Sequence, residues 1–139
     1  MRTTVVIPTY NEAENVAPMT EALWGLGLPD LDVLIVDDAS PDGTGDVADR
    51  LAAESRGRLH VLHRTGTRGL GRAYVDGFRW ALAHGAEAVV QMDCDFSHAP
   101  TDVPKLLACV PGYDVAVGSR YVEGGQVDED WGLGRALLS

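Results

Sequence analysis

The stretch LDVLIVDDASPDGTG at residues 31–45 decides the fold class of this chain. Its first six residues are almost continuously apolar, which is typical of a strand buried on both faces in a parallel sheet. Two aspartates end the apolar run, and Ser-Pro-Asp-Gly is a turn signal. The helical pattern GDVADRLAAES follows at residues 45–55. A buried strand, a polar turn and a helix together predict an α/β unit.

The same unit recurs on both sides of this stretch. Strands are expected at residues 3–8, 31–38, 59–63, 86–93 and 113–120, and helices at 11–27, 45–55, 69–85, 101–110 and 133–139. The expected buried stripe of the third helix is Leu70, Tyr74, Phe78 and Ala81. Alternating strands and helices predict a single α/β domain over residues 1–139, with a Rossmann-like, mostly parallel sheet and helices on both faces.

Composition narrows the classes of function. A length of 139 residues with 45% hydrophobic and 23% charged residues is ordinary for one globular domain. The net charge of −10 argues against nucleic-acid binding, because phosphate backbones need a basic surface. No apolar run is long enough to span a bilayer. Cys94 and Cys109 match no zinc or redox spacing, so we expect reduced thiols in a cytoplasmic protein.

Polar residues collect at the ends of all five expected strands. The segments are PTYNE at 8–12, DDASPDG at 37–43, HRTGTRGLG at 63–71, DCDFSH at 93–98 and GSRY at 118–121. In an open α/β sheet, ligands bind beyond the carboxyl ends of the strands. We therefore expect these five segments to share one edge of the sheet and to form the ligand site there.

The segment after the first expected strand has both a local and a functional explanation. Asn11 with Glu14 three residues later matches a capping box, which is the favoured interpretation of Asn11. Tyr10 could stack on a base, and Glu12 could accept a hydrogen bond from a sugar hydroxyl or a base edge. Alternatively, Tyr10 and Glu12 lie in a solvated turn.

The next two segments carry paired acids and several arginines. A carboxylate just past a strand commonly holds ribose hydroxyls, so Asp37 or Asp38 could do so, and one of them could be an ordinary turn residue. Arg64, Arg68 and Arg72 precede or begin a helix, where they could meet phosphate. For Arg72, a solvated helix face is the favoured interpretation.

Asp93 and Asp95 lie one residue apart after the fourth expected strand. One carboxylate could hold a metal ion and the other a sugar or a water, and Mg²⁺ or Mn²⁺ prefers such oxygen ligands. An ion bridging two phosphates would let this acidic chain hold a diphosphate. Ser97 or His98 could complete the coordination. Helix capping by Asp95 or Ser97 is the alternative, and it leaves Asp93 unexplained.

Two arginines near the end of the chain are further candidates. Arg120 ends the expected strand 113–120, where a phosphate contact and a structural ion pair are both open. Arg135 lies in the expected last helix, where a solvated face is the default.

Taken in order, five motifs resemble those of the family 2 inverting glycosyltransferases, most closely the polyprenol (dolichol) monophosphate mannose synthases. They are VVIPTYNEAENV, VDDASPDGTGDVADRL, GLGRAYVDGF, QMDCDFSHAP and VGSRYVEGG. The resemblance implies a GT-A fold with a D-x-D metal motif that uses Mg²⁺ or Mn²⁺. It also implies inverting transfer of mannose from GDP-mannose to a polyprenyl (dolichyl) phosphate, with peripheral contact at the cytosolic face of a membrane.

The resemblance assigns roles to matching positions only. The guanosine part of the donor would be held by Pro8, Tyr10, Glu12, Val36 and Asp38. Asp93 and Asp95 would bind the metal and the donor, with Cys94 contacting the donor through its backbone and Ser97 a further metal ligand. Asp95 and Arg120 would be the catalytic residues, Arg120 through a phosphate contact. Arg135 would face the acceptor phosphate.

The sequence departs from the family pattern at three positions and in length. Cys94 replaces the usual alanine, Ser97 replaces a metal-contacting glutamine of some members, and Ala99 replaces an acidic residue or histidine. The family's catalytic domain continues past this point, so we expect the chain to be its N-terminal part. The alternatives are another nucleotide sugar or acceptor, an inactive donor-binding fragment, and a receiver-like signalling domain.

Overall fold

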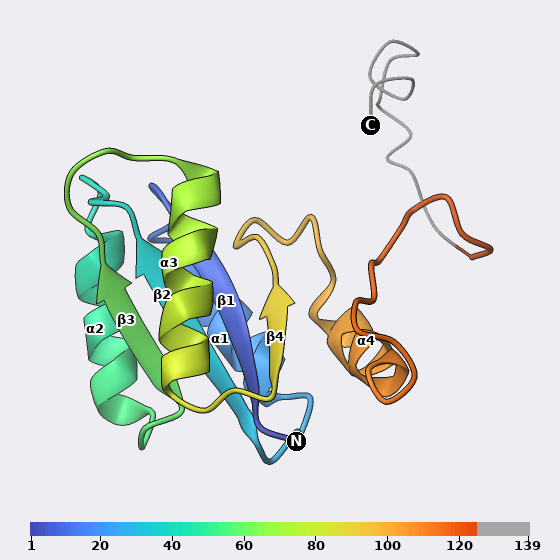
Figure 1. Ribbon diagram of the computed structural model, residues 1–139. Coiled ribbons are helices and arrows are strands. Elements are labelled where there is room, and N and C mark those ends of the chain that lie inside the picture. The colour runs from blue at the N-terminus through green and yellow to red at the C-terminus, as the bar shows by residue number, and fades with distance from the viewer. Residues whose placement is uncertain (125–139) are drawn as a thin grey trace, which may run out of the picture.

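The structure is a computed structural model that describes residues 1–124. Its sheet has the strand order β3-β2-β1-β4, with every neighbouring pair parallel (Figure 1). The strands are β1 (Thr3–Thr9), β2 (Leu31–Asp37), β3 (Leu59–His63) and β4 (Ala88–Gln91). The helices are α1 (Val16–Trp24), α2 (Thr44–Glu54), α3 (Leu70–Ala83), the 3-10 helix η1 (Pro100–Asp102) and α4 (Val103–Cys109).

The register of the sheet aligns the strand ends. Asp37 at the end of β2 pairs with Thr9 of β1 on one side and with His63 of β3 on the other. The loops that follow these three strands therefore begin side by side. These three loops therefore share one edge of the sheet, as expected, and ligand binding at this edge stays a prediction.

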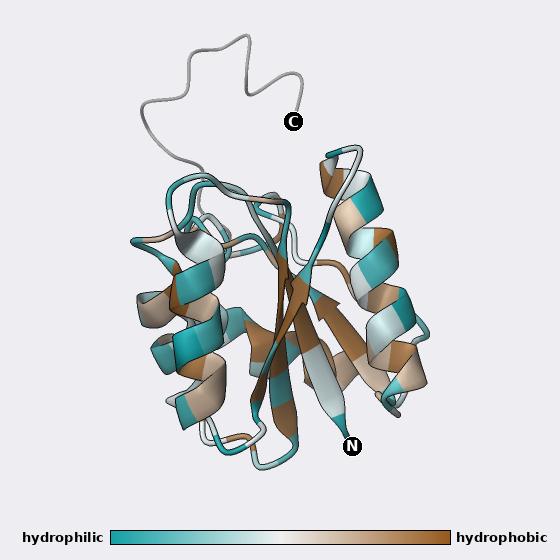
Figure 2. Cartoon of the chain, turned by 90° about the vertical axis from the view of Figure 1, so that its left-hand side faces the viewer, coloured by the Kyte–Doolittle hydropathy of each residue, from teal (hydrophilic) through white to brown (hydrophobic). Residues whose placement is uncertain are grey.

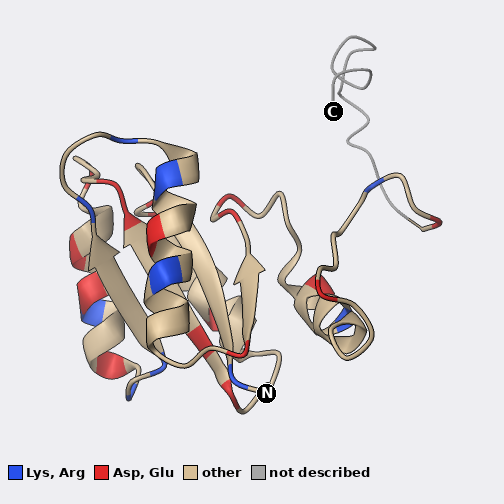
Figure 3. Cartoon of the chain, viewed as in Figure 1, with Lys and Arg blue, Asp and Glu red and all other residues tan. Residues whose placement is uncertain are grey.

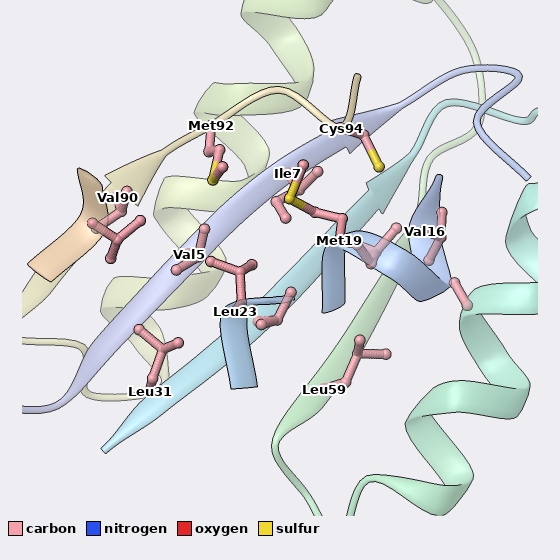
Figure 4. Packing of buried hydrophobic residues seen from close by; sticks show 14 residues of the cluster. Val5, Ile7, Val16, Met19, Leu23, Leu31, Leu59, Val90, Met92 and Cys94 are labelled. Atoms are coloured by element: carbon pink, nitrogen blue, oxygen red, sulfur yellow. The ribbon is translucent and has the colours of Figure 1, made fainter. Parts of the chain in front are cut away.

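Two apolar clusters lie between the sheet and its helices, one on each face. On one face, α1 and α2 cover a cluster that includes Ile7 (Figure 4). On the other face, α3 covers Val6 and Val36. Gly77 permits this close packing, because a Cβ at that position would stand 2.4 Å from Cγ1 of Val6. Figure 2 shows helices on both sides of the sheet, so the predicted Rossmann-like layering is confirmed.

Residues 113–120 do not form the expected strand. Val115 and Val117 are 76% and 80% exposed, although their alternation is typical of a strand. The segment runs past α4 and lies apart from the sheet (Figure 1). A strand gains its ladder hydrogen bonds only from a neighbour, and this segment has none among residues 1–124. The prediction is wrong because pairing depends on a second segment.

The helices α2, α3 and α4 lie close to their predicted ranges, whereas α1 begins at Val16 instead of at the predicted residue 11. The predicted helix 133–139 lies outside the described residues. Leu70 is 61% exposed because it begins α3 at the end that extends past the strands, so its predicted burial is wrong (Figure 1). Pro104 lies in the first turn of α4, as predicted. Cys94 and Cys109 are free thiols, as expected. Within residues 1–124, no helix combines the length and the apolar character needed to cross a membrane.

Candidate functional site

Four loops follow the carboxyl ends of the strands. They comprise residues 10–15 after β1, 38–43 after β2, 64–69 after β3 and 92–99 after β4. Figure 3 shows acidic segments after β2 and β4 and basic segments after β3 at this edge. The candidate site is built from these loops, and each positions different chemical groups.

The two aspartates after β2 have different environments. Asp37 is only 3% exposed and accepts hydrogen bonds from Thr9 Oγ1 at 3.0 Å and from Ser40 Oγ at 2.6 Å. It is the turn residue of the pair. Asp38 turns toward the loop after β3, where it accepts from the Gly69 N–H at 2.9 Å and pairs with Arg64. Of the two, Asp38 is the carboxylate that borders the ligand edge.

Arg64 is a nearly buried cation whose side chain is 8% exposed. It pairs with Asp38 and, from Nε, with Asp76 Oδ2 at 2.8 Å. The hydrogen bond to Asp76 and the charges of both aspartates raise the pKa of Arg64, against the opposite effect of burial. Because both carboxylates engage its guanidinium, the sequence-based suggestion that Arg64 meets phosphate is wrong in this structure. Arg64 instead fixes the position of Asp38.

The loop after β1 is held by side chains of the loop after β2. Three consecutive backbone N–H groups donate hydrogen bonds to these side chains. Asn11 donates to Ser40 Oγ (3.0 Å), Glu12 to Thr44 Oγ1 (2.9 Å) and Ala13 to Asp42 Oδ2 (3.1 Å). Asn11 has a left-handed backbone at φ 56°, and α1 begins only at Val16, without a side-chain cap. The predicted capping box of Asn11 and Glu14 is therefore wrong, because the other loop satisfies these N–H groups.

Sequence reasoning missed the roles of Ser40, Asp42 and Thr44. The motif Ser-Pro-Asp-Gly at residues 40–43 predicts a turn and indicates no further function. Thr44 is fully buried, and its hydroxyl donates to Asp42 while accepting from the Glu12 N–H. The Thr44 hydroxyl is the main cause that lowers the pKa of Asp42. A hydroxyl and a carboxylate two residues apart in a turn were the available signal, since such side chains commonly bind nearby backbone.

Tyr10 and Glu12 stand in the loop that these bonds hold. Tyr10 is 45% exposed, and the guanidinium carbon of Arg68 lies 4.6 Å from its ring centre. Arg68 also donates to the Tyr10 hydroxyl at 2.9 Å and to the Ala39 carbonyl at 3.3 Å. Glu12 is half-buried and accepts from Asn15 Nδ2 at 2.7 Å. Both residues make protein contacts while Tyr10 stays exposed, so the functional interpretation and the solvated-turn alternative both stay predictions.

Pro8 and Val36 pair with each other in the register of β1 and β2. The Val36 side chain is fully buried in the cluster beneath α3. Only its backbone is therefore available to a ligand. Pro8 is half-buried beside it.

Asp93 and Asp95 flank a residue that points into the core. Cys94 is 2% exposed among side chains of the α1 cluster, and burial raises the pKa of its thiol to about 12 (Figure 4). Asp93 instead faces α3, where its Oδ1 accepts from the Tyr74 hydroxyl at 2.6 Å. Asp95 is exposed, and hydrogen bonds from Ser97 lower its pKa.

The donor set suits a cation that keeps ligands of its own. Among residues 1–124, no group of three or more His, Cys, Asp or Glu side chains could hold a metal ion. Within the same residues, Asp93 Oδ2 receives no hydrogen bond, so this oxygen is free for a ligand. Mg²⁺ typically binds one or two carboxylates and completes its shell with phosphate and water. Asp93 and Asp95 fit an ion of this kind.

Of the other predicted residues, some lie beside Asp93 and Asp95 and some do not. The Ser97 N–H donates to Asp95 Oδ1 at 3.0 Å, and His98 Nδ1 accepts from the Asp93 N–H at 3.2 Å, so both adjoin the pair. Arg120 is half-buried in the segment 113–124, which lies apart from the strand ends (Figure 1). Arg135 lies outside the described residues. The metal role of Ser97 and the phosphate roles of both arginines stay predictions.

Comparison with known proteins identifies the family. The model described as "Glycosyl transferase family 2" matches residues 4–137. The chain belongs to this family. The resemblance of the motifs to the family 2 glycosyltransferases is thereby confirmed.

Two curated relatives match the whole chain. Undecaprenyl-phosphate mannosyltransferase of Micrococcus luteus is 50% identical over 139 residues, which are 100% of this chain and 56% of the relative. Polyprenol monophosphomannose synthase of Mycolicibacterium smegmatis is 50% identical over 139 residues, which are 99% of this chain and 52% of the relative. The chain thus spans about half the length of these relatives.

Solved structures share the fold. The mannosyltransferase PcManGT from Pyrobaculum calidifontis, in complex with GDP-Man and Mn²⁺, is 35% identical with a TM-score of 0.57 over 68% of this chain and 27% of that chain. TarS of S. aureus, at 22% identity, has a TM-score of 0.63 over 82% of this chain and 33% of that chain. These neighbours confirm the GT-A-like fold class.

Proposed function

We propose that this chain is the donor-binding part of an inverting mannosyltransferase, which transfers mannose from GDP-mannose to a polyprenyl (dolichyl) phosphate with Mg²⁺ or Mn²⁺. The observation that carries the proposal is 50% identity across the entire chain to two polyprenyl-phosphate mannosyltransferases. A site of matching chemistry supports it, with an aromatic and acidic loop at one end and a D-x-D pair at the other. Residues 1–139 would then form the N-terminal part of the catalytic domain.

The loops after β1 and β2 would hold the nucleoside. Tyr10 offers an exposed ring on which a base can stack, and Glu12 and Asp38 offer carboxylates to base or ribose donors. Pro8 and Val36 would contribute backbone groups. The protein holds these loops in place before any ligand arrives, which reduces the ordering cost of binding.

Asp93 and Asp95 would hold the diphosphate end of the donor through a divalent cation, with Cys94 contributing its backbone. When bound, such a cation neutralises charge that develops on the leaving diphosphate. Asp95 is the better placed of the two for an exposed ligand, and its lowered pKa keeps it ionised at neutral pH. Arg120 would add positive charge at a donor phosphate, and Arg135 would face the acceptor phosphate.

The reaction is a single displacement at the anomeric carbon of mannose. An oxygen of the acceptor phosphate forms the new bond to this carbon while the bond to the GDP oxygen breaks, and GDP leaves with that electron pair. The acceptor phosphate is already ionised near neutral pH, so no strong general base is required. Catalysis would rest on positioning and on electrostatic stabilisation of the leaving group.

The acceptor implies work at a membrane surface, because a polyprenyl chain is lipid-soluble. We propose peripheral contact with the cytosolic face of a membrane, as the resemblance to polyprenol monophosphate mannose synthases implies. Within the family, a different nucleotide sugar or acceptor is the second candidate. A donor-binding unit that needs the remaining half of its relatives for activity is the third. The family match leaves the receiver-like alternative without support.

Calorimetry with the Asp95→Ala variant tests the proposal. Wild type should bind GDP more tightly when Mn²⁺ is added, and Asp95→Ala should lose that gain. Asp102→Ala is the matched control, because Asp102 is an exposed aspartate paired with Lys105 away from the D-x-D pair. Unchanged Mn²⁺ dependence in Asp95→Ala would show that the metal assignment is wrong.

Two further assays separate the candidates. Preference for UDP over GDP would favour another nucleotide sugar. Release of GDP from GDP-mannose on adding a short polyprenyl phosphate would identify an active mannosyltransferase. Metal-dependent GDP binding without that release would identify a donor-binding unit.

A further inference from the structure

One buried hydroxyl reaches the D-x-D pair from a distant element. Tyr74 lies in α3, and its hydroxyl donates to Asp93 Oδ1 at 2.6 Å across 19 residues of sequence. Within residues 1–124, no other side chain outside the loop 92–99 donates a hydrogen bond to Asp93 or Asp95. The other hydrogen bonds of the two aspartates lie inside the loop: the Ser97 N–H donates to Asp95 Oδ1, and the Asp93 N–H donates to His98 Nδ1.

Packing holds the Tyr74 hydroxyl in one place. The residue is 6% exposed, and its ring packs in the α3 cluster with Val36 and at 5.9 Å from the ring of Phe78. A tyrosine hydroxyl is protonated at neutral pH, so the hydroxyl of Tyr74 serves as the hydrogen-bond donor to Asp93 there. A donor that rigid can set the rotamer of the carboxylate that it contacts.

The bond also divides the two oxygens of Asp93 between protein and ligand. Oδ1 faces Tyr74, while Oδ2 has no hydrogen-bond partner among residues 1–124. A carboxylate that binds a cation commonly has its other oxygen hydrogen-bonded, which orients it and tunes its basicity. The Tyr74–Asp93 contact has the chemistry of such an outer partner.

We infer that Tyr74 is a positioning residue for the metal and diphosphate end of the donor site, acting through Asp93. The inference rests on the proposed function, because it needs Asp93 to face a cation-bound diphosphate. It assigns a part in donor binding to α3, a helix that otherwise covers one face of the sheet. Tyr74 itself touches neither donor nor acceptor in this role.

The Tyr74→Phe variant tests the inference, because it removes the hydroxyl and keeps the ring. Mn²⁺ binding in the presence of saturating GDP is followed by electron paramagnetic resonance of free Mn²⁺, which needs no catalytic turnover. We expect the apparent Kd for Mn²⁺ to rise by about 10–100-fold, as for other outer partners of metal ligands. Binding of GDP without metal should stay within about twofold of wild type, because the nucleoside loops are untouched.

Thr20→Val is the matched control. Thr20 is a fully buried hydroxyl in α1 that donates to the Val16 carbonyl at 2.8 Å, remote from the D-x-D pair. Its removal should lower stability without changing the Kd for Mn²⁺. A merely structural role of Tyr74 predicts the same behaviour for both variants.

The outcomes separate the two claims. If wild type shows Mn²⁺-dependent GDP binding and Tyr74→Phe has an unchanged Kd for Mn²⁺, the inference is overturned and the proposed function stands. If wild type binds GDP with no metal dependence, both are overturned. A selective rise of the Mn²⁺ Kd in Tyr74→Phe, absent in Thr20→Val, supports the inference.

Discussion

The ligand edge contains two regions that are held in different ways. The nucleoside region, residues 10–15, 38–44 and 64–69, is joined by hydrogen bonds between loops that are far apart in sequence. The diphosphate region, residues 92–99, is held mainly by bonds within itself, such as the Ser97 N–H to Asp95. Its described hydrogen bonds to other elements are the Met92 N–H to the Val6 carbonyl at the start of the segment and the Tyr74 hydroxyl to Asp93.

This contrast indicates that the two ends of a donor would meet different surfaces. Hydrogen bonds between its loops already hold the proposed nucleoside region, so we expect little conformational entropy to be lost there when a donor binds. The diphosphate region offers carboxylate oxygens that a cation and phosphate would complete. We therefore expect substitutions in the nucleoside region to affect folding and binding together, and those in the diphosphate region to affect mainly metal-dependent binding.

The largest effect on stability is expected for Asp38→Ala. It leaves the nearly buried Arg64 with one partner, and breaking a buried pair in this way costs about 3–5 kcal/mol. Urea unfolding measures the change. Asp76→Ala is the control, because Asp76 pairs with the same arginine but is 40% exposed, and its loss should cost only about 1 kcal/mol. If both variants lose the same unfolding free energy, burial does not determine how much each ion pair of Arg64 contributes to stability.

A smaller effect is expected for Thr44→Val. The change leaves the Glu12 N–H without its acceptor and should cost about 1–3 kcal/mol. It should also weaken metal-free GDP binding by about tenfold, equivalent to about 1.4 kcal/mol, because Tyr10 and Glu12 lose their support. Unfolding and calorimetry measure the two effects.

Ser55→Ala is the matched control for Thr44→Val. The Ser55 hydroxyl also donates to one group, the Ala52 carbonyl, and accepts from a backbone N–H, that of Leu59, but it lies at the opposite edge of the sheet. Its loss should lower stability without changing GDP binding. Weakened GDP binding in Ser55→Ala would attribute the effect to general destabilisation and contradict a preformed nucleoside region.

The smallest effect is expected for Asp42→Asn and appears as a pH dependence. Hydrogen bonds, first from Thr44, hold the pKa of Asp42 below its ordinary value of about 3.9. The folded state therefore binds fewer protons than the unfolded chain, and the stability that Asp42 contributes is present above the unfolded pKa and lost as pH falls through the folded pKa. Asp42→Asn should be less stable than wild type at neutral pH, with the difference narrowing below about pH 4.

Unfolding free energies across the acidic range check this expectation. Asp95→Asn provides the comparison from the diphosphate region, since the pKa of Asp95 is also lowered, but by Ser97 of its own loop. For both variants, the difference in unfolding free energy from wild type should become smaller at acidic pH. Only Asp42→Asn should weaken metal-free GDP binding. A pH-independent difference for Asp42→Asn would show that its carboxylate is not held as the structure indicates.

Local pattern predicted much of the fold and part of the site. The apolar run before Asp37 and Asp38 indicated a buried parallel strand, and the strand ends indicated a common ligand edge. Pattern failed at residues 113–120, where alternating valines lack a neighbouring strand, and at Asn11, where a capping box was expected. At Asn11 the decisive partner is Ser40 in another loop, and at residues 113–120 no strand of residues 1–124 pairs with the segment. A local window of sequence contains no record of either fact.

The sequence by itself determined the alternation of strands and helices, the acidic D-x-D pair and the family. These depend on periodicity and on short motifs, which act over a few residues. Only the tertiary structure decided that Asp37 is a turn residue while Asp38 borders the site, and that Tyr74 contacts Asp93. Such assignments depend on which side chains meet after the helices pack on the sheet, and packing joins residues whose separation in sequence carries no local signal.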